Sequence, residues 1–407
     1  MFCLTYPTLD IIIGSMQKEA DDIDIQDIRA NIPILKDVIS FNSGMDGPLP
    51  TTTIKAINDS FNKQYTLGPF TQAGIKTFYD EILETKNKLA SFLLCNPENI
   101  SLTPNTTFGI NIALNAFNWT SEDEIISTRH EHPGALFPLY NLKERYSTKI
   151  KLIDIDTHNS LKSIRENLSQ NTKAIVLSHI FYETGNTIHN LQEVLNMLRE
   201  KNIISIIDGA QAVGAIKVNL KELNPDFYAA PGHKWLMGPY GTGFLYVNEI
   251  LFSKRPPWPS IVGFNSALFS NKDRLYDFNF KWRPNENASL FEFGGLNSSI
   301  FKGLGASIDF ITSSLKQFNI YNRIHQLTAY LIERLNQNPN IIVHTSKNHA
   351  GLVSWQHKNI HAHALVNKLW EEKKIAIREI QGLNLSRASI HFFNTKEEID
   401  FLLSQLP

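Results

Sequence analysis

Cysteine is scarce in this sequence of 407 residues, which contains only Cys3 and Cys95. Two cysteines are too few for a disulfide framework and show no metal-ligand spacing, so we expect no metal site. Their scarcity favours a reducing, cytoplasmic compartment. Long apolar runs are also lacking. The apolar segment at residues 9–13 is too short to cross a membrane, and its flanks are not those of a targeting signal.

An excess of either charge is missing as well, since 39 Lys and Arg residues balance 40 Asp and Glu residues. The formal net charge of -1 offers no bulk attraction to nucleic acid or to acidic membranes. We therefore expect a small-molecule partner. The composition, 42% hydrophobic and 19% charged, is that of a soluble globular protein. The length predicts two domains, or one large α/β domain with an appendage.

An acidic residue and a lysine stand out in the middle of the chain. Residues 203–207 form a short, apolar, β-branched run, which predicts a buried strand of a parallel sheet that ends at Asp208. Asp208 then lies beyond the carboxyl end of a strand, where ligands bind in open α/β sheets. Two further strands are predicted over residues 226–230 and 243–247. Lys234 lies in the glycine-bounded loop between them.

Asp208 and Lys234 are the two anchors that a pyridoxal phosphate site needs. A lysine binds the aldehyde of this cofactor covalently, and a carboxylate keeps the pyridine nitrogen protonated, so that the ring can accept electrons. Each residue also has a plain alternative, because a strand-end aspartate often caps the next helix and most lysines lie on the surface. The sequences DGAQ and GHK, each after an apolar strand, favour the cofactor site.

Strand-like and helix-like patterns alternate up to this region, which predicts a mostly parallel sheet. Further strands are predicted over residues 38–41, 99–103, 124–128, 149–155, 174–180, 341–344, 351–355 and 389–393. Helices are predicted over residues 73–94, 104–117, 135–146, 191–201, 300–335, 362–372 and 396–405. The helix start at Thr106 and Thr107 offers backbone amides and hydroxyls that bind phosphate, although such residues are commonly plain caps.

Seven motifs spread over residues 103–395 carry a family resemblance: TPNTTFGINIAL, STRHEHPGAL, SHIFYETGN, IDGAQAVGA, GHKWLMGP, FEFGGLN and SRASIHFFNT. With them the chain resembles the class V aminotransferase family of fold-type I pyridoxal phosphate enzymes, which includes the cysteine desulfurases. The likeness is strongest to the cysteine/cystine C-S lyases.

The resemblance implies an α/β fold with a mostly parallel seven-stranded sheet, helices on both faces, and a smaller α+β domain. We expect an N-terminal arm, or part of the small domain, over residues 1–35. The large cofactor-binding domain is then expected over residues 36–260 and the small domain over residues 261–407. The family likeness also implies a homodimer with shared active sites and an amino-acid substrate.

The resemblance assigns catalytic roles to Lys234, Asp208 and His132. By the match of EHPGA, His132 lies flat against the cofactor ring, and His130 does not. Further cofactor contacts are implied for Gln211, His233, Thr106, Thr107, Tyr182 and Gly295. Tyr182 departs from the asparagine of the desulfurases. Gly295 replaces a threonine in a segment that reaches across the dimer interface to the partner's phosphate, so only its backbone amide remains for that contact.

Two arginines and an asparagine are candidates for substrate binding. Arg387 matches the family's carboxylate-binding arginine, and its planar guanidinium suits that role. Arg378 is a weaker candidate, with a surface charge as the alternative. Asn42 begins a turn-rich loop at residues 42–48, which either edges the substrate pocket or is a plain connection.

The same family pattern bears on the reaction. Desulfurases need a nucleophilic cysteine on a mobile loop between the two arginine regions, and residues 378–387, REIQGLNLSR, contain none. We therefore expect a lyase that eliminates the β-sulfur of cysteine, cystine or a cysteine conjugate, giving pyruvate, ammonia and a sulfur product. An aminotransferase or an amino-acid epimerase is the alternative.

Overall fold

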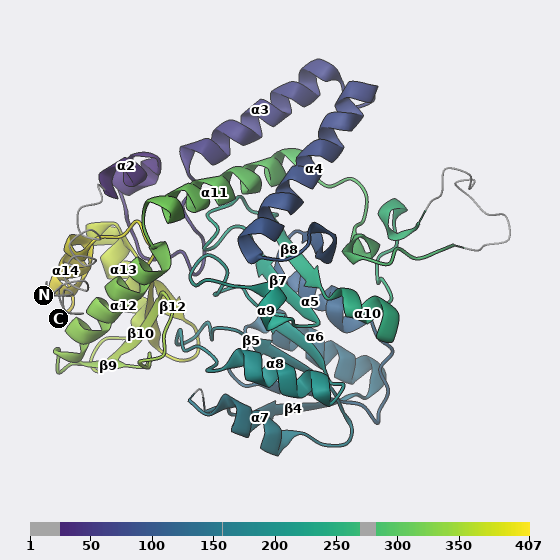
Figure 1. Cartoon of the computed structure of the whole chain (residues 1–407). Helices are drawn as coiled ribbons and strands as arrows, with labels where there is room; N and C mark the ends of the chain where they lie inside the picture. Colours follow the sequence, from purple (N-terminus) through teal and green to yellow (C-terminus); the bar gives the residue numbers. More distant parts are fainter. Residues whose placement is uncertain (1–24, 157, 269–281) are drawn as a thin grey trace, which may run out of the picture.

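A computed structural model describes residues 25–156, 158–268 and 282–407 of the chain (Figure 1). Most of the expected N-terminal arm and Cys3 lie outside these ranges. The described chain begins with a short helix, α2 (Ile25–Ala30). No helix in the described ranges combines the length and the apolar character that a bilayer crossing requires.

Seven strands form the central sheet, in the order β2-β8-β7-β6-β5-β3-β4. They are β2 (Ile100–Thr103), β3 (Glu124–Thr128), β4 (Lys149–Ile153), β5 (Thr172–Ser178), β6 (Ile204–Asp208), β7 (Phe227–Pro231) and β8 (Gly243–Val247). The pairings from β4 through β7 are parallel, whereas β8 is antiparallel to both β2 and β7. The predicted mostly parallel seven-stranded sheet is confirmed. Its inner strands are almost entirely buried because both faces of the sheet are covered.

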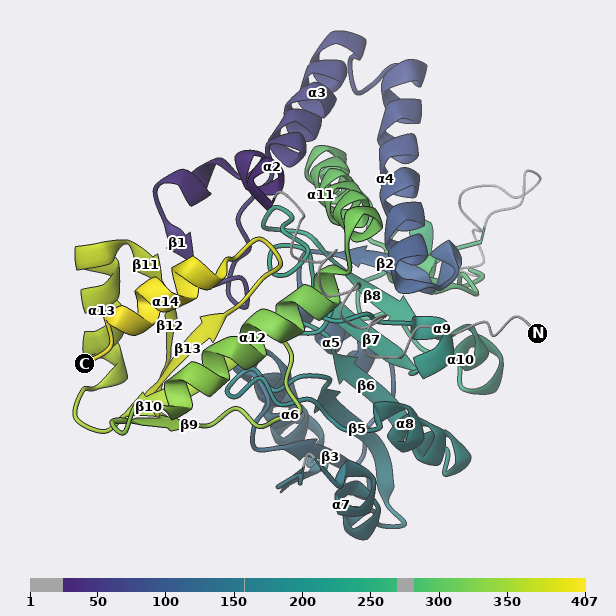
Figure 2. The ribbon, with the colours of Figure 1, turned by 60° about the vertical axis from the view of Figure 1, so that its left-hand side comes forward.

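Helices cover both faces of this sheet, and each face has its own hydrophobic core (Figures 1 and 2). One core joins Leu102, Leu177 and Phe244 to α4 and α8. The other core joins Val176 and Leu245 to α5 and α6. The helices on and around the sheet are α4 (Gln72–Leu93), α5 (Thr106–Asn115), α6 (Pro133–Tyr146), α7 (Ser160–Asn167), α8 (Leu191–Glu200), α9 (Leu220–Leu223), α10 (Glu249–Lys254) and α11 (Ser298–Gln317).

One long helix, α3 (Thr51–Leu67), has no counterpart among the predicted elements. It lies along α11 and α4 (Figure 2). Its buried contacts are made by hydroxyl groups: Thr53 Oγ1 is 2.6 Å from Ser307 Oγ, and Ser60 Oγ is 2.8 Å from Ser299 Oγ. A search for an apolar helical stripe passes over such a helix, because its packed face is small and polar.

A smaller antiparallel sheet lies beside the large one, with strand order β12-β13-β10-β9. Its elements are β9 (Ile341–Val343), β10 (Leu352–His357), β12 (Arg378–Ile380), β13 (Leu385–Ser389), α12 (Ile320–Asn336), α13 (Ala362–Lys373) and α14 (Lys396–Ser404). β1 (Ile39–Ser40) pairs with β11 (Ile375–Ala376). The core of this part combines Phe41 with Leu331 and Trp355. Residues 39–41 thus pack with the C-terminal part, while the boundaries predicted at residues 35 and 260 remain predictions.

The strand predicted over residues 389–393 is wrong, because β13 occupies Leu385–Ser389. Ile390, Phe392 and Phe393 are fully buried, yet they follow the last β13 pairing. The apolar pattern of these residues reflects their burial and not the pairing of a strand. The difference matters for function, since it places Arg387 inside a strand.

Candidate active site

A cavity of ≈ 400 Å³ lies around Lys234, at the carboxyl ends of the parallel strands. The predicted residues that line it are Thr106, Thr107, His132, Tyr182, Asp208, Gln211, His233, Lys234 and Arg378. The structure therefore brings together residues from five separate motifs. Asn42, Arg387 and Gly295 are not among the lining residues.

Lys234 and Asp208 each favour the charged form of the other inside this cavity, whereas burial opposes both charges. Burial lowers the pKa of the Lys234 amine to about 8, and Asp208 opposes this decrease. Burial also raises the pKa of the Asp208 carboxyl, while a hydrogen bond from the Ala210 amide (2.8 Å) and the charge of Lys234 oppose the increase. A cationic group bound next to Asp208 would strengthen this opposition and keep the carboxyl ionised. The Lys234 amine can exchange protons near neutral pH.

The loop at residues 42–48 packs directly on the backbone of Lys234. The Gly47 amide donates to the His233 carbonyl (2.8 Å), and a Cβ at Gly47 would meet the Lys234 carbonyl oxygen at 2.1 Å. Only glycine allows this approach. Asn42 begins the loop, and its Oδ1 is buried without a hydrogen-bond partner. The structure therefore gives this loop a part in shaping the site, while substrate contact by Asn42 remains a prediction.

Gln211 braces the same loop from the other side. Its Nε2 donates to the Gly44 carbonyl (2.8 Å), and its Oε1 accepts from Trp235 Nε1 (2.9 Å). The second hydrogen of Nε2 is left for a ligand. His233 stacks on Tyr240 with ring centroids 4.8 Å apart, and its Nδ1 is buried without a partner. The cofactor contacts predicted for both residues remain predictions.

The start of α5 supplies the anion-binding end of the cavity. Asn105 caps the helix, since its Oδ1 accepts from the Phe108 amide (2.9 Å). The amides of Thr106 and Thr107 come before the first intrahelical hydrogen bond and have no partner within the helix. The positive end of the helix dipole lies at this same end of α5. Thr106 Oγ1 is buried and has no partner. A phosphate group fits these unsatisfied donors.

His132 forms one wall of the cavity. It is the N-cap of α6, and its Nδ1 accepts from the Gly134 amide (3.0 Å), so its proton resides on Nε2. Burial, followed by the charges of Lys234 and Arg378, lowers the pKa of His132 to about 4, which leaves the ring neutral at pH 7. Tyr182 meets this ring edge-on, with centroids 5.2 Å apart. A flat, neutral ring in this position suits stacking on an aromatic cofactor.

Arg387 lies deeper than the cavity wall and is 1% exposed. Its Nη1 donates to the Tyr182 carbonyl (2.6 Å), while Nε and Nη2 are buried without partners. Burial, aided by Arg378 on the neighbouring strand, lowers its pKa to about 9. Two unsatisfied donors on a buried cation are strong indications of a carboxylate site. Arg378 is half-buried and lines the cavity, so the alternative of a plain surface charge is disfavoured.

Glu131 is a buried carboxylate beside the site that the sequence analysis did not single out. Thr128 Oγ1 (2.8 Å) and Ser178 Oγ both donate to its carboxylate. Burial raises the pKa of Glu131 to about 7, and the nearby charge of Asp208 adds to the increase. The sequence did contain a signal for Glu131, because this carboxylate lies shortly after the strand predicted over residues 124–128. Asp208 was recognised from a similar position, directly after the strand predicted over residues 203–207.

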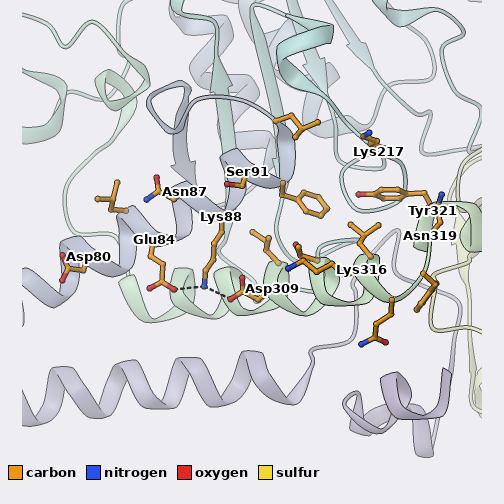
Figure 3. Close-up of a pocket in the computed structure, with 18 residues that line it drawn as sticks. Asp80, Glu84, Asn87, Lys88, Ser91, Lys217, Asp309, Lys316, Asn319 and Tyr321 are labelled. Atoms are coloured by element: carbon orange, nitrogen blue, oxygen red, sulfur yellow. Dashed lines mark hydrogen bonds and ion pairs between the residues drawn. The ribbon is translucent and has the colours of Figure 1, made fainter. Parts of the chain in front are cut away.

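Gly295 lies apart from Lys234. It lines a different cavity of ≈ 460 Å³ with Tyr79, Phe264 and Phe293. Its predicted contact with the phosphate of a partner subunit remains a prediction. A further cavity, of ≈ 930 Å³, lies between α4 and α11, where Lys88 is 2.6 Å from both Glu84 and Asp309 (Figure 3). None of the predicted site residues lines it.

Together, the buried lysine, the strand-end carboxylate, the helix start with unsatisfied donors and the neutral histidine of the cavity wall fit the site of a fold-type I pyridoxal phosphate enzyme. The chain belongs to the class V aminotransferase family, whose model matches residues 46–402. Pyridoxal 5'-phosphate is therefore its cofactor, and the unsatisfied donors of this site fit that molecule.

Two relatives and one enzyme of known structure place the chain within this family. A probable cysteine desulfurase of Methanothermobacter thermautotrophicus is 27% identical over 93% of this chain and 96% of its own length. A cysteine desulfurase of Salmonella agona is 27% identical over 94% and 97%. The cystine C-S lyase C-DES, in complex with its reaction product cysteine persulfide, is 28% identical with a TM-score of 0.85, over 92% of this chain and 98% of that chain. A C-DES mutant with glycine covalently linked to the cofactor matches equally well.

Proposed function

We propose that this enzyme is a C–S lyase that eliminates the β-sulfur substituent of cystine, cysteine or a cysteine conjugate. The main support for this proposal is the tight hairpin between Arg378 and Arg387. β12 and β13 pair from Arg378 with Arg387 to Ile380 with Leu385, so only residues 381–384 remain for the turn. Four residues, none of them cysteine, do not form a mobile loop that delivers a thiol to the substrate.

The cysteine in the described ranges is also unsuited to accept sulfur. Cys95 follows α4, packs against the hydrophobic core and does not line the Lys234 cavity. Burial raises the pKa of its thiol to about 12, so very little thiolate exists at neutral pH. Elimination needs no protein thiol. The low cysteine content also leads us to place the enzyme in the reducing cytoplasm.

The residues of the site divide the work of elimination. Bound pyridoxal phosphate supplies an electron sink for the pair left when the substrate Cα loses its proton. The Lys234 amine, with its pKa lowered by burial to about 8, accepts that proton. Arg387 holds the α-carboxylate through Nε and Nη2. His132 is neutral at pH 7 and therefore adds no second cation beside the reacting amine.

Cystine fits the charge pattern of the cavity best. It carries two α-carboxylates, and two arginines are available, since Arg378 lines the cavity and the buried Arg387 has two donor atoms without partners. Loss of the Cα proton and cleavage of the C–S bond give aminoacrylate and cysteine persulfide. Water then converts aminoacrylate to pyruvate and ammonia. We expect Arg378→Gln to raise KM for cystine more than KM for a conjugate with a single carboxylate.

A product assay tests the proposal directly. With cystine, the purified holoenzyme should release pyruvate, ammonia and persulfide in equal amounts. The double variant Cys3→Ser, Cys95→Ser should keep this activity. Keto acid formed only with an added amino acceptor would instead identify an aminotransferase, and inversion at Cα without pyruvate would identify an epimerase.

Desulfurase activity is the second candidate, favoured by the names of the curated relatives. It transfers sulfur to a protein thiol and leaves alanine. Alanine formation that disappears in the double serine variant would establish it and refute the lyase.

We also propose that the active enzyme is a homodimer with shared sites. Tyr79 and Phe264 are 51% and 57% exposed and line the cavity that contains Gly295. Contiguous exposed apolar surface commonly marks an interface. Sedimentation equilibrium should show a dimer, and Phe264→Glu should weaken it and reduce activity. A fully active monomer would contradict the proposal.

A further inference from the structure

An ion pair at the edge of the Lys234 cavity has no part in the chemistry above. His130 Nδ1 lies 2.9 Å from Glu183 Oε2, and the two side chains are 41% and 13% exposed. His130 precedes the cavity wall residue His132 by two positions, and Glu183 directly follows Tyr182. The pair therefore ties the loop after β3 to the loop after β5.

The loop after β5 is fixed at several further points. Arg387 Nη1 donates to the Tyr182 carbonyl, and Ser354 Oγ donates to the Glu183 carbonyl. These bonds fix its backbone to the small sheet. The Glu183 carboxylate adds a side-chain link to the large sheet, close to the edge-on contact of Tyr182 with His132. Through the loop after β5, the pair thus connects the loop after β3 to the small sheet.

We infer that His130 and Glu183 are positioning residues, whose ion pair keeps Tyr182 against His132 and keeps Arg387 aligned for the substrate carboxylate. His130 touches neither the cofactor pocket nor the reacting amine, since it is absent from the cavity lining. Its action passes through Glu183 to the backbone that Arg387 holds.

The pair is sensitive to pH in a definite direction. The hydrogen bond to Glu183 raises the pKa of His130 above 6.5, burial opposes this, and the charges of Asp154 and Glu131 add to it. Arg129, 3.6 Å from Asp154, offsets part of that last contribution. Because the folded-state pKa is raised, the charged pair is complete below it and is lost as pH rises through it. KM for the substrate should increase over the same interval.

Proton NMR of the histidine ring measures the pair without any substrate. In the holoenzyme His130 should titrate above its ordinary value, and in Glu183→Gln its pKa should fall back toward 6.5. An unchanged His130 titration in this variant would overturn the inference. The measurement does not depend on which reaction the enzyme catalyses.

Steady-state kinetics with cystine test the positioning role, and this second experiment rests on the proposed lyase function. At pH below the His130 pKa, His130→Gln and Glu183→Gln should each raise KM for cystine about fivefold with kcat little changed, the size expected for one partly exposed charge pair. The rise of KM with pH should also disappear. His363→Gln, which removes a similar pair with Glu379 (3.0 Å) on the small domain, is the control and should leave KM unchanged. An equal rise of KM in the control, or a change in kcat alone, would overturn the inference. If the NMR titration of His130 is as expected but the enzyme has no lyase activity, only the proposed lyase function is refuted.

Discussion

Lys234 shares its electrostatic surroundings with Asp208, Arg387 and Arg378. We expect Lys234→Ala to reduce turnover about a thousandfold or more, because the covalent anchor and the proton-transfer amine are lost together. The thermal midpoint of the apoprotein should change little, since the Asp208 carboxyl, which faces Lys234, keeps its hydrogen bond from the Ala210 amide. Borohydride reduction of the native holoenzyme should place a pyridoxyl group on the Lys234 peptide, detectable by mass. Near-native activity of the variant would contradict the assignment.

Asp208 offers a more selective test. In Asp208→Asn the side-chain oxygen can still accept from the Ala210 amide, so the turn after β6 should keep its shape. The charge that faces Lys234 is removed. We expect kcat to fall about a hundredfold or more while the cofactor stays bound, an electrostatic loss at the transition state. Cofactor absorbance and steady-state rates measure the two quantities separately, and equal rates for both proteins would count against this role.

Individual site residues differ in how well the sequence reveals them. Asp208 and Lys234 follow apolar strands, so their position relative to the sheet could be predicted. Whether a side chain faces a cavity could not be predicted from the sequence. Thr106 is distinguished from an ordinary cap only by its unpartnered hydroxyl, and Arg387 only by two unsatisfied donors. Glu131 was missed because it is recognised only by its buried hydrogen bond from Ser178, a residue 47 positions away in the sequence.

At the scale of elements, the β12–β13 hairpin is the feature most open to test. Gly382 in its turn has a φ of +81°, and a Cβ there would meet no atom within 4 Å. Gly382→Ala should therefore cost about 1 kcal/mol of stability through backbone strain alone. KM should rise, because the turn sets the relative position of Arg378 and Arg387. Leu383→Ala, an exposed change in the same turn, is the control for chemical denaturation and kinetics, and an unaffected Gly382 variant would argue against this coupling.

The elements also show why apolar patterning succeeds in one place and fails in another. Strands β3 and β8 were predicted at their observed bounds, and both are almost entirely buried. Buried strands leave short apolar runs in the sequence, Ile125 and Ile126 in β3 and residues 244–247 in β8. Helix α3 was missed because Thr53 and Ser60 pack through hydroxyl hydrogen bonds. The strand near Phe393 was misplaced because a buried run without sheet pairing has the same pattern.

At the scale of the whole molecule, buried histidines should make stability depend on acid. His391 is fully buried; Nδ1 accepts from the Phe392 amide, and Nε2 donates to the Trp235 carbonyl. Burial lowers its pKa to about 4, and burial does the same for His179. The unfolded chain therefore binds more protons as pH falls below 6.5, and stability should decrease down to about pH 4.

His391→Asn isolates one part of this dependence. Urea unfolding at several pH values between 7.5 and 4.5 should show a shallower loss of stability in the variant, with a difference of at most about 3 kcal/mol across the interval. The variant should be less stable at pH 7.5, because packing against Trp235 is lost. An identical pH slope in both proteins would show that other groups govern acid unfolding.

The half-buried position of Cys95 has a consequence for chemical resistance. Alkylating agents and peroxide attack thiolates, and a thiol whose pKa burial raises to about 12 presents almost none at physiological pH. Enzymes that carry sulfur on a reactive cysteine are inactivated by such reagents. The elimination that we propose needs no protein thiol, so oxidising conditions that stop thiol-dependent sulfur transfer should leave this enzyme active.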